Sequence, residues 1–220
     1  MLELYAKTIE WAEKNKIVPN GTVQAQTLKL ISEAGELACH VENSTSIKDD
    51  IGDMLVVVAI VSKLSNIELD LATLIEEASI LDDAVGTDAD GILLLLSMLG
   101  ELSDKVLKGE DLELPLLEVV TTLYFIARTH KLTLEECWYH AYQDIKDRRG
   151  ILTKAGVFIK STDIAYRQIT EILALCDNTS DVGDIVTVIS SDADAMPAKD
   201  MSLERLHKLI VEDGYTAVPF

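Results

Sequence analysis

The sequence of 220 residues contains few basic residues relative to its acids. Lysine and arginine together number 19 against 38 aspartates and glutamates, so the formal net charge is −19. Because a surface this negative repels a phosphate backbone, we do not expect a nucleic acid partner. The same charge suits a protein that gathers divalent cations.

Cysteine is also scarce. Cys39, Cys137 and Cys176 show no paired spacing, and the four histidines are scattered along the chain. This pattern is typical of reduced thiols in a cytosolic protein rather than of a disulfide framework or a cysteine/histidine metal site.

Long apolar runs are absent. The longest, at residues 54–61 and around 92–96, are much shorter than the roughly 18 residues that a membrane span needs. The first residues show no basic segment followed by an apolar one, so no signal peptide is visible. We therefore expect no membrane partner and a cytoplasmic location, which is the host cytoplasm if a phage encodes the protein.

The remaining composition is typical of a globular protein, with 48% hydrophobic residues and only 4 prolines. Apolar residues recur at helical spacing and there is little strand signal, so the predicted fold class is an all-α helical bundle. The expected helices span residues 2–16, 22–42, 47–64, 70–83, 92–108, Pro115 to about 130, 133–149, 162–176 and 202–213. A short extended segment is expected at 157–160.

Three local signals predict where these elements begin and end. Residues 46–49, Ser-Ile-Lys-Asp, match a capping box for the helix at 47–64, which makes Asp49 a capping residue. Residues 82–91 are acidic and contain two glycines, so they are expected to form a linker. Gly150 is expected to end the helix at 133–149.

The chain also contains an internal similarity that indicates a duplication. Ser32, Gly35, Glu36 and Leu37 recur 65 positions later as Ser97, Gly100, Glu101 and Leu102. The segments at 69–71 and 132–134 match at an offset of 63. Chance similarity between amphipathic helices is the alternative, but the constant order favours two copies of one helical unit.

Four acids of the first copy predict a metal site. Glu33 and Glu36 are three residues apart and so share a helix face, and Asp50 and Asp53 repeat this spacing on the next helix. In an antiparallel hairpin the two pairs can face each other. Four converging carboxylates repel one another unless a hard cation such as Mg²⁺ compensates them.

A solvated acidic face is the alternative for the first pair, because a polar stripe runs through Gln26, Lys29, Glu33, Glu36 and His40. Asp53 argues against it, since this residue lies inside an otherwise apolar helix where an unpaired charge is costly. We therefore favour metal binding.

The residues resemble those of the MazG-like all-α nucleoside triphosphate pyrophosphohydrolases, especially phage-type members. The resemblance covers about residues 4–163. It rests on four segments, which are Gln26-x-x-Lys29-Leu30-x-x-Glu33-x-Gly35-Glu36-Leu37-Ala38, Asp50-Ile51-Gly52-Asp53, Lys146-Asp147-Arg148-Arg149-Gly150 and Gly156-Val157-Phe158-Ile159-Lys160.

The resemblance implies hydrolysis of a nucleoside or deoxynucleoside triphosphate to the monophosphate and pyrophosphate. Glu33, Glu36, Asp50 and Asp53 would then be catalytic and hold Mg²⁺, which Mn²⁺ could replace, and an activated water would attack the α-phosphorus. Substrate binding is implied for four further residues, which are Gln26, Lys29, Lys146 and Arg149.

The chain departs from the simple family pattern because a second block separates the acids from the Lys-Asp-Arg-Arg-Gly segment. In that block Met98 replaces Glu33 and Glu101 is kept. The counterparts of Asp50 and Asp53 stay open between two pairs, Glu118 with Thr121 and Glu113 with Leu116; either way the second acid set is broken.

The incomplete acid set of the second block predicts a pseudo-dimer with one composite site. The acids of the first block and Lys146 and Arg149 of the second would form it. The expected domains are residues 1–86, 87–160 and a helical extension at 161–220. The chain could act as a monomer or a homodimer. The alternatives to an enzyme are a protein that binds metal and nucleotide without turnover, and a helical partner-binding module.

Overall fold

The computed structural model describes residues 1–71, 74, 75, 78, 86–152, 158–162, 186–189, 195, 196 and 216–219. The chain divides into two compact units, residues 1–14 with 21–147 and residues 15–20 with 148–220. The predicted all-α class is confirmed, because seven helices account for most of the described residues. Most of the two expected halves, 1–86 and 87–160, lies within the first unit, but residues 15–20 and 148–160 belong to the second.

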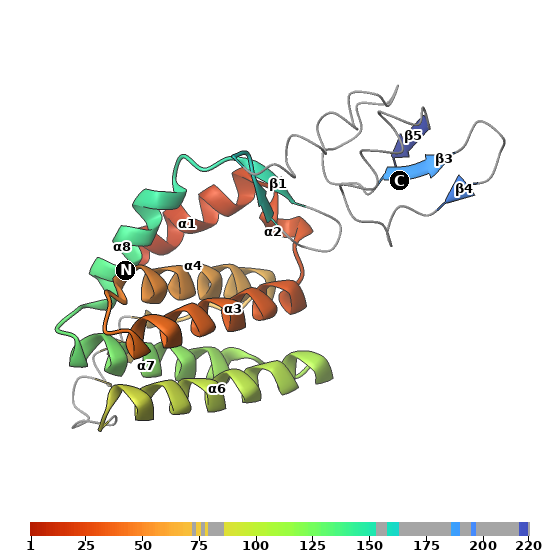
Figure 1. The fold of residues 1–220 in the computed structure, drawn as a ribbon. Helices are drawn as coiled ribbons and strands as arrows, with labels where there is room; N and C mark the ends of the chain where they lie inside the picture. The colour runs from red at the N-terminus through yellow and green to blue at the C-terminus, as the bar shows by residue number, and fades with distance from the viewer. Residues whose placement is uncertain are drawn as a thin grey trace. The chain divides into compact units, whose positions relative to one another are not determined.

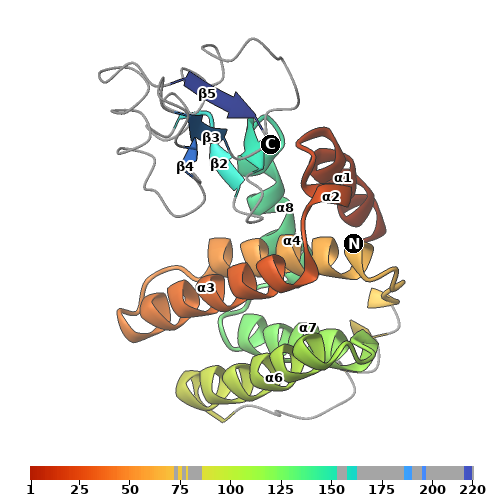
Figure 2. The ribbon, with the colours of Figure 1, turned by 90° about the vertical axis from the view of Figure 1, so that its right-hand side faces the viewer.

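The first unit is built on two helical hairpins that pack side by side (Figure 1). Helix α3 pairs with α4 and α6 pairs with α7, while α3 contacts α6 and α4 contacts α7. Helices α1 and α8 cover the other side of α4 (Figure 2). The bounds of the six helices are α1 Leu2–Lys14, α3 Val23–Glu42, α4 Lys48–Leu64, α6 Asp88–Lys108, α7 Glu113–Thr129 and α8 Leu134–Ile145.

Helix α4 is the centre of this unit, as its apolar sequence predicts. Twelve of its 17 residues are buried. It contacts α1, α3, α7 and α8, so it has apolar neighbours on nearly every side. Burying such a helix all round provides the main hydrophobic stabilisation of the first unit.

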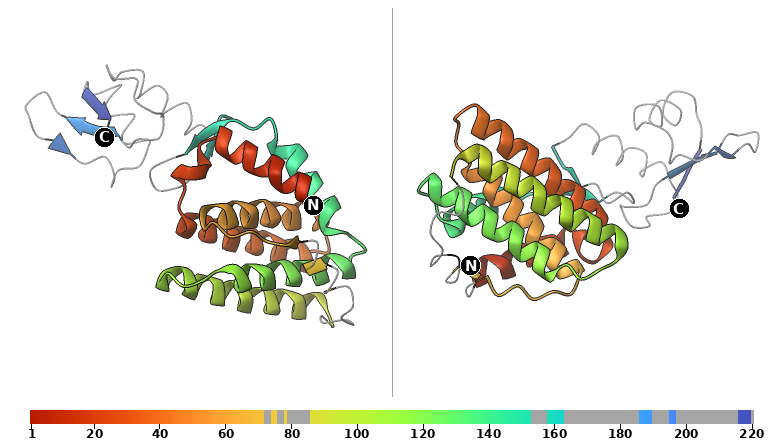
Figure 3. Two further views of the ribbon diagram at one scale, coloured as in Figure 1. Left: turned by 180° about the vertical axis from the view of Figure 1, so that it is seen from behind. Right: turned by 90° about the horizontal axis from the view of Figure 1, so that it is seen from below.

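The second unit contains the short helix α2 (Ile17–Asn20) and two small antiparallel sheets. Strand β1 (Gly150–Leu152) pairs with β2 (Phe158–Lys160), which confirms the extended segment expected at 157–160. Strand β3 (Val186–Ile189) lies between β4 (Ala195–Met196) and β5 (Thr216–Pro219) (Figure 3). These last three strands were not expected; the helices expected at 162–176 and 202–213 lie outside the described residues, as does most of 70–83.

Three expected element ends are wrong. The capping box expected at residues 46–49 is absent, because the N-cap of α4 is the buried Ile47, whose side chain makes no capping hydrogen bond. The expected linker at 82–91 is too long, since Thr87 and Asp90 form a capping box that starts α6 at Asp88.

Gly150 is the third of these ends. Helix α8 ends at Ile145 and Gly150 instead begins β1. A Cβ atom on Gly150 would lie 2.3 Å from the carbonyl oxygen of Ile159, so the close strand pairing explains the glycine.

The two hairpins of the first unit share one register. Helices α4 and α7 begin and end 65 positions apart, and α3 and α6 begin 65 positions apart. Their N-caps, Thr22 and Thr87, hold the same offset. The left-handed residues do so as well, since Ser44 matches Gly109 and Asn66 matches Lys131.

The offset of 65 gives a third alignment for the second acid pair. It matches Asp50 with Pro115 and Asp53 with Glu118, which differs from both pairings considered from the sequence, and the correspondence stays a prediction. The helix that follows each hairpin starts 63 positions apart, at residue 71 and at Leu134, because the second loop is two residues shorter. The offset of 63 belongs to this following helix, and pairing Asp50 with Glu113 applies it to the hairpin, where the helix bounds differ by 65.

Gly52 allows α8 to lie close against α4. A Cβ atom at this position would be 2.2 Å from the carbonyl oxygen of Cys137 and 2.7 Å from the Cβ of Ala141. Because backbone must move to make room, we expect Gly52→Ala to lower the free energy of unfolding by about 2 kcal/mol. Urea denaturation followed by circular dichroism measures this change.

Gly100→Ala is the matched control. This glycine also lies inside a helix, but nothing lies within 4 Å of a Cβ atom placed there. The control should raise the free energy of unfolding by about 0.5 to 1 kcal/mol, because alanine favours helix. Equal effects of the two substitutions would contradict the packing argument.

Candidate functional site

The candidate site lies where the second half of α3 faces the first half of α4. Two of its acids are buried although both are charged groups: Glu33 is 3% exposed and Asp50 is 5% exposed. Burial raises the pKa of Asp50, and the negative charges of Asp49 and Glu33 raise it further. The charge of Glu33 on α3 therefore acts on the Asp50 carboxyl of α4.

His40 is the direct partner of Asp50. The Nδ1 atom of His40 lies 2.7 Å from one carboxylate oxygen of Asp50 and 2.9 Å from the other. This contact opposes the upward shift of the Asp50 pKa without cancelling it. His40 belongs to the polar stripe predicted on α3. Its partner, however, is Asp50, which lies ten positions later on the next helix.

Glu33 has a partner on its own helix. The amino group of Lys29, one turn earlier, forms an ion pair with a carboxylate oxygen of Glu33. The Lys29 side chain is 53% exposed, whereas that of Glu33 is buried. Lys29 was expected to bind substrate, and here its charge compensates one of the expected metal ligands.

The other members of the predicted set differ in how accessible they are. Glu36 is exposed, Asp53 is half-buried and Gln26 is buried. The amide of Gln26 therefore has little contact with solvent in this arrangement.

The two cations expected from the second block lie in different units. Lys146 is the C-cap of α8 in the first unit, where its amino group contacts the side-chain oxygen of Gln143. Arg149 belongs to the second unit and is exposed. A composite site that joins these cations to the acids stays a prediction.

A second group of possible ligands was missed in the sequence. Asp49, His140 and Asp144 place one ligand atom each within 4.8 Å of one another, and all three residues are exposed. His140 and Asp144 are four residues apart on α8, a spacing that signals a shared face. The Nε2 atom of His140 lies 3.8 Å from a carboxylate oxygen of Asp49, and this contact depends on the packing of α8 on α4, which sequence spacing does not encode.

The residues present fit a hard divalent cation. The candidate site offers carboxylate oxygens, which Mg²⁺ and Mn²⁺ prefer. Two of these carboxylates are buried, and the charge of Glu33 adds to the cost of ionising Asp50, so a bound cation would relieve this repulsion.

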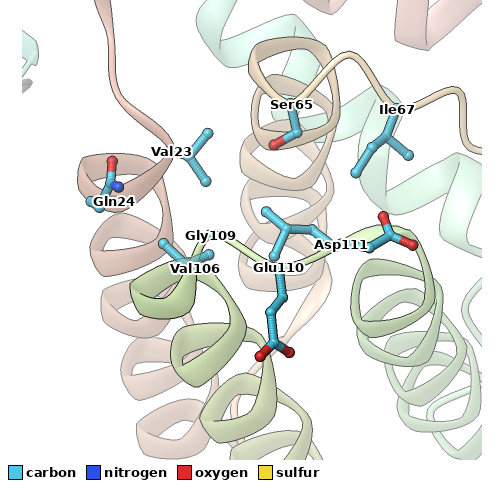
Figure 4. A pocket seen from close by; sticks show the side chains of 9 residues that line it. Val23, Gln24, Ser65, Ile67, Val106, Gly109, Glu110 and Asp111 are labelled. Atoms are coloured by element: carbon cyan, nitrogen blue, oxygen red, sulfur yellow. The ribbon is translucent and has the colours of Figure 1, made fainter.

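A hollow of about 260 Å³ lies at the other end of the hairpins (Figure 4). Its lining comes from the first turn of α3, the end of α4, the last turn of α6 and the loop before α7. Among the described residues that line it, the charged ones are Glu110 and Asp111. Two acids make this hollow a poor place for a phosphate, so we do not assign the substrate to it.

Comparison with known proteins gives one partial similarity and no family. No family model matches the chain, and no solved structure matches it. Over 70 residues it is 41% identical to an uncharacterised 18.2 kDa protein from the rep–hol intergenic region of Haemophilus phage HP1 (strain HP1c1). The matched segment covers 30% of this chain and 43% of the phage protein, less than half of that relative.

None of the described helices combines the length and the apolarity that crossing a membrane requires.

The raised pKa of Asp50 predicts how stability changes with pH. Because the pKa in the folded protein lies above the ordinary value of 3.8, the native state holds this proton more tightly than the unfolded chain does. Ionisation of Asp50 therefore removes stability as pH rises from about 3.8 through the folded pKa, and no such loss exists below that window.

We expect Asp50→Asn to raise the melting temperature of the cation-free protein at pH 7 and to have little effect below pH 3.8. Thermal unfolding in the presence of a chelator, from acidic to neutral pH, measures the difference. A variant that is less stable than wild type at pH 7 would mean that the contact with His40 outweighs the cost of burial.

Proposed function

We propose that this protein is a Mg²⁺-dependent nucleoside triphosphate pyrophosphohydrolase related to the MazG-like family. The observation that carries the proposal is the pair of buried carboxylates, Glu33 and Asp50, contributed by the two helices of one hairpin. Buried acids with interacting charges are the arrangement that a divalent cation stabilises.

The residues have separate roles in this proposal. Glu33 and Asp50 form the fixed part of the ligand set, and the exposed Glu36 and half-buried Asp53 complete it from the same two helices. When bound, Mg²⁺ supplies charge neutralisation of the triphosphate and activation of the attacking water. Lys29 is exposed enough to turn from Glu33 to a phosphate oxygen.

We also propose that the two hairpins are copies of one unit and that only the first retains a complete acid set. The constant offset of 65 in helix ends, capping threonines and left-handed residues supports the duplication. In the second hairpin Met98 and Pro115 stand at the positions of Glu33 and Asp50, and neither side chain can bind a hard cation. One site per chain follows from this asymmetry.

A protein that binds a nucleotide without hydrolysing it is the second candidate. The observation that favours it is that both buried acids already have partners from the chain, Lys29 for Glu33 and His40 for Asp50. An acid set compensated in this way can be stable with little cation bound.

Hydrolysis is tested with a panel of nucleoside and deoxynucleoside triphosphates and Mg²⁺, by measuring release of pyrophosphate and monophosphate. We expect Glu36→Gln and Asp53→Asn each to abolish turnover while the circular dichroism spectrum stays unchanged, because each loses a ligand charge and neither residue is fully buried. Glu101→Gln, at the matching position of the second hairpin, is the control and should retain turnover. Binding without release of product from any nucleotide would favour the second candidate.

The two cations of the second block are tested separately from the acids. Arg149→Ala and Lys146→Ala should weaken turnover without changing cation affinity, because these side chains are expected to contact phosphate rather than metal. Asp53→Asn should instead weaken cation binding first. Wild-type turnover in the Lys146→Ala/Arg149→Ala double variant would show that the composite site is wrong.

A further inference from the structure

His40 faces both oxygens of the Asp50 carboxylate with a single nitrogen atom. The distances of 2.7 and 2.9 Å from Nδ1 place that nitrogen between the two oxygens rather than beside one of them. A carboxylate commonly binds a cation through the lone pairs on this same side. In the present arrangement the imidazole therefore occupies the part of Asp50 that a cation needs.

The matching position in the second hairpin holds Lys105. It lies 65 positions after His40, and its amino group is 3.9 Å from a carboxylate oxygen of Glu101, the counterpart of Glu36. In both hairpins, then, this position on the first helix places a nitrogen donor near the acids. The difference is that the first hairpin carries an imidazole, which is a weaker and less permanent positive partner than an ammonium group.

The two members of the His40–Asp50 pair differ strongly in their surroundings. The side chain of Asp50 is 5% exposed and is held on a helix packed on nearly every side, whereas the side chain of His40 is 47% exposed. If the contact breaks, His40 can turn into solvent and Asp50 cannot follow. The acid is the fixed member and the histidine is the movable one.

We propose that His40 is a displaceable occupant of the cation site: it contacts Asp50 while the site holds no cation and turns outward when a divalent cation binds. This inference rests on the proposed function, because it takes the acids to be cation ligands. Mg²⁺ binds carboxylate oxygens at about 2.1 Å, so a cation and the His40 N–H directed at the same two oxygens would compete.

The competition has a measurable consequence. Wild-type protein must break the His40–Asp50 contact before a cation can bind, so part of the binding free energy is lost. In a variant without the imidazole, Asp50 remains buried and its charge is less well compensated. A cation therefore stabilises the folded variant more than it stabilises wild type. Removing His40 should therefore tighten cation binding, by about tenfold for one charge-assisted hydrogen bond.

The test is calorimetric titration of MgCl₂ and MnCl₂ into nucleotide-free protein, for wild type, His40→Ala and Lys105→Ala. We expect His40→Ala to bind Mg²⁺ about tenfold more tightly than wild type, and the control Lys105→Ala to match wild type. In wild-type protein, the ¹⁵N resonances of His40 should shift as Mg²⁺ is added, because the imidazole loses its carboxylate partner.

A second variant keeps the test valid if His40→Ala does not fold. His40→Phe keeps a ring of similar size without the nitrogen, and the rise of its melting temperature on addition of Mg²⁺ should exceed that of wild type. Equal or weaker binding in the His40 variants overturns the inference and leaves the proposed function standing. Absence of Mg²⁺ and Mn²⁺ binding in every variant overturns both, while tighter binding without turnover of any nucleotide overturns only the enzymatic proposal.

Discussion

The burial of Asp50 is the constraint on which the rest of the first unit depends. Helix α4 is enclosed by α1, α3, α7 and α8, and Gly52 lets α8 lie against its backbone two residues after Asp50. The aspartate cannot escape to solvent without disturbing this packing. Its position in the first turn of α4 offers some compensation from the helix dipole, and His40 adds a direct contact. The remaining imbalance appears as the raised pKa of Asp50.

Much of the fold could be predicted from the sequence because its signals are local. Helix periodicity located α1, α3, α4 and α7 to within a few residues, and the spacing of Glu33, Glu36, Asp50 and Asp53 placed them on the two helices of one hairpin. The errors came from interactions that spacing does not encode. The N-cap of α4 is the buried Ile47 rather than a residue with a capping side chain. Gly150 is required by a close strand pairing, not by a helix end.

The site itself was only partly predictable for the same reason. The pairing of His40 with Asp50 depends on how the two helices of the hairpin are aligned, and a one-residue shift would separate them. Likewise, Asp49 meets His140 only because α8 packs on α4. In the second hairpin, Pro115 occupies the first turn of α7, where proline is tolerated, and one buried oxygen of Glu118 lacks a hydrogen-bond partner among the described residues.

The two buried acids and their partners differ in how far their side chains are exposed to solvent. Glu33 and Asp50 are buried, whereas Lys29 and His40 each expose about half of the side chain. A salt bridge that serves stability alone gains most when both members are held in place, since a mobile partner leaves the buried charge uncompensated. Here only the acids are fixed, and each partner reaches them from solvent. Such an arrangement can exchange its partners without unfolding, which a site for an exchangeable divalent cation requires and a structural ion pair does not.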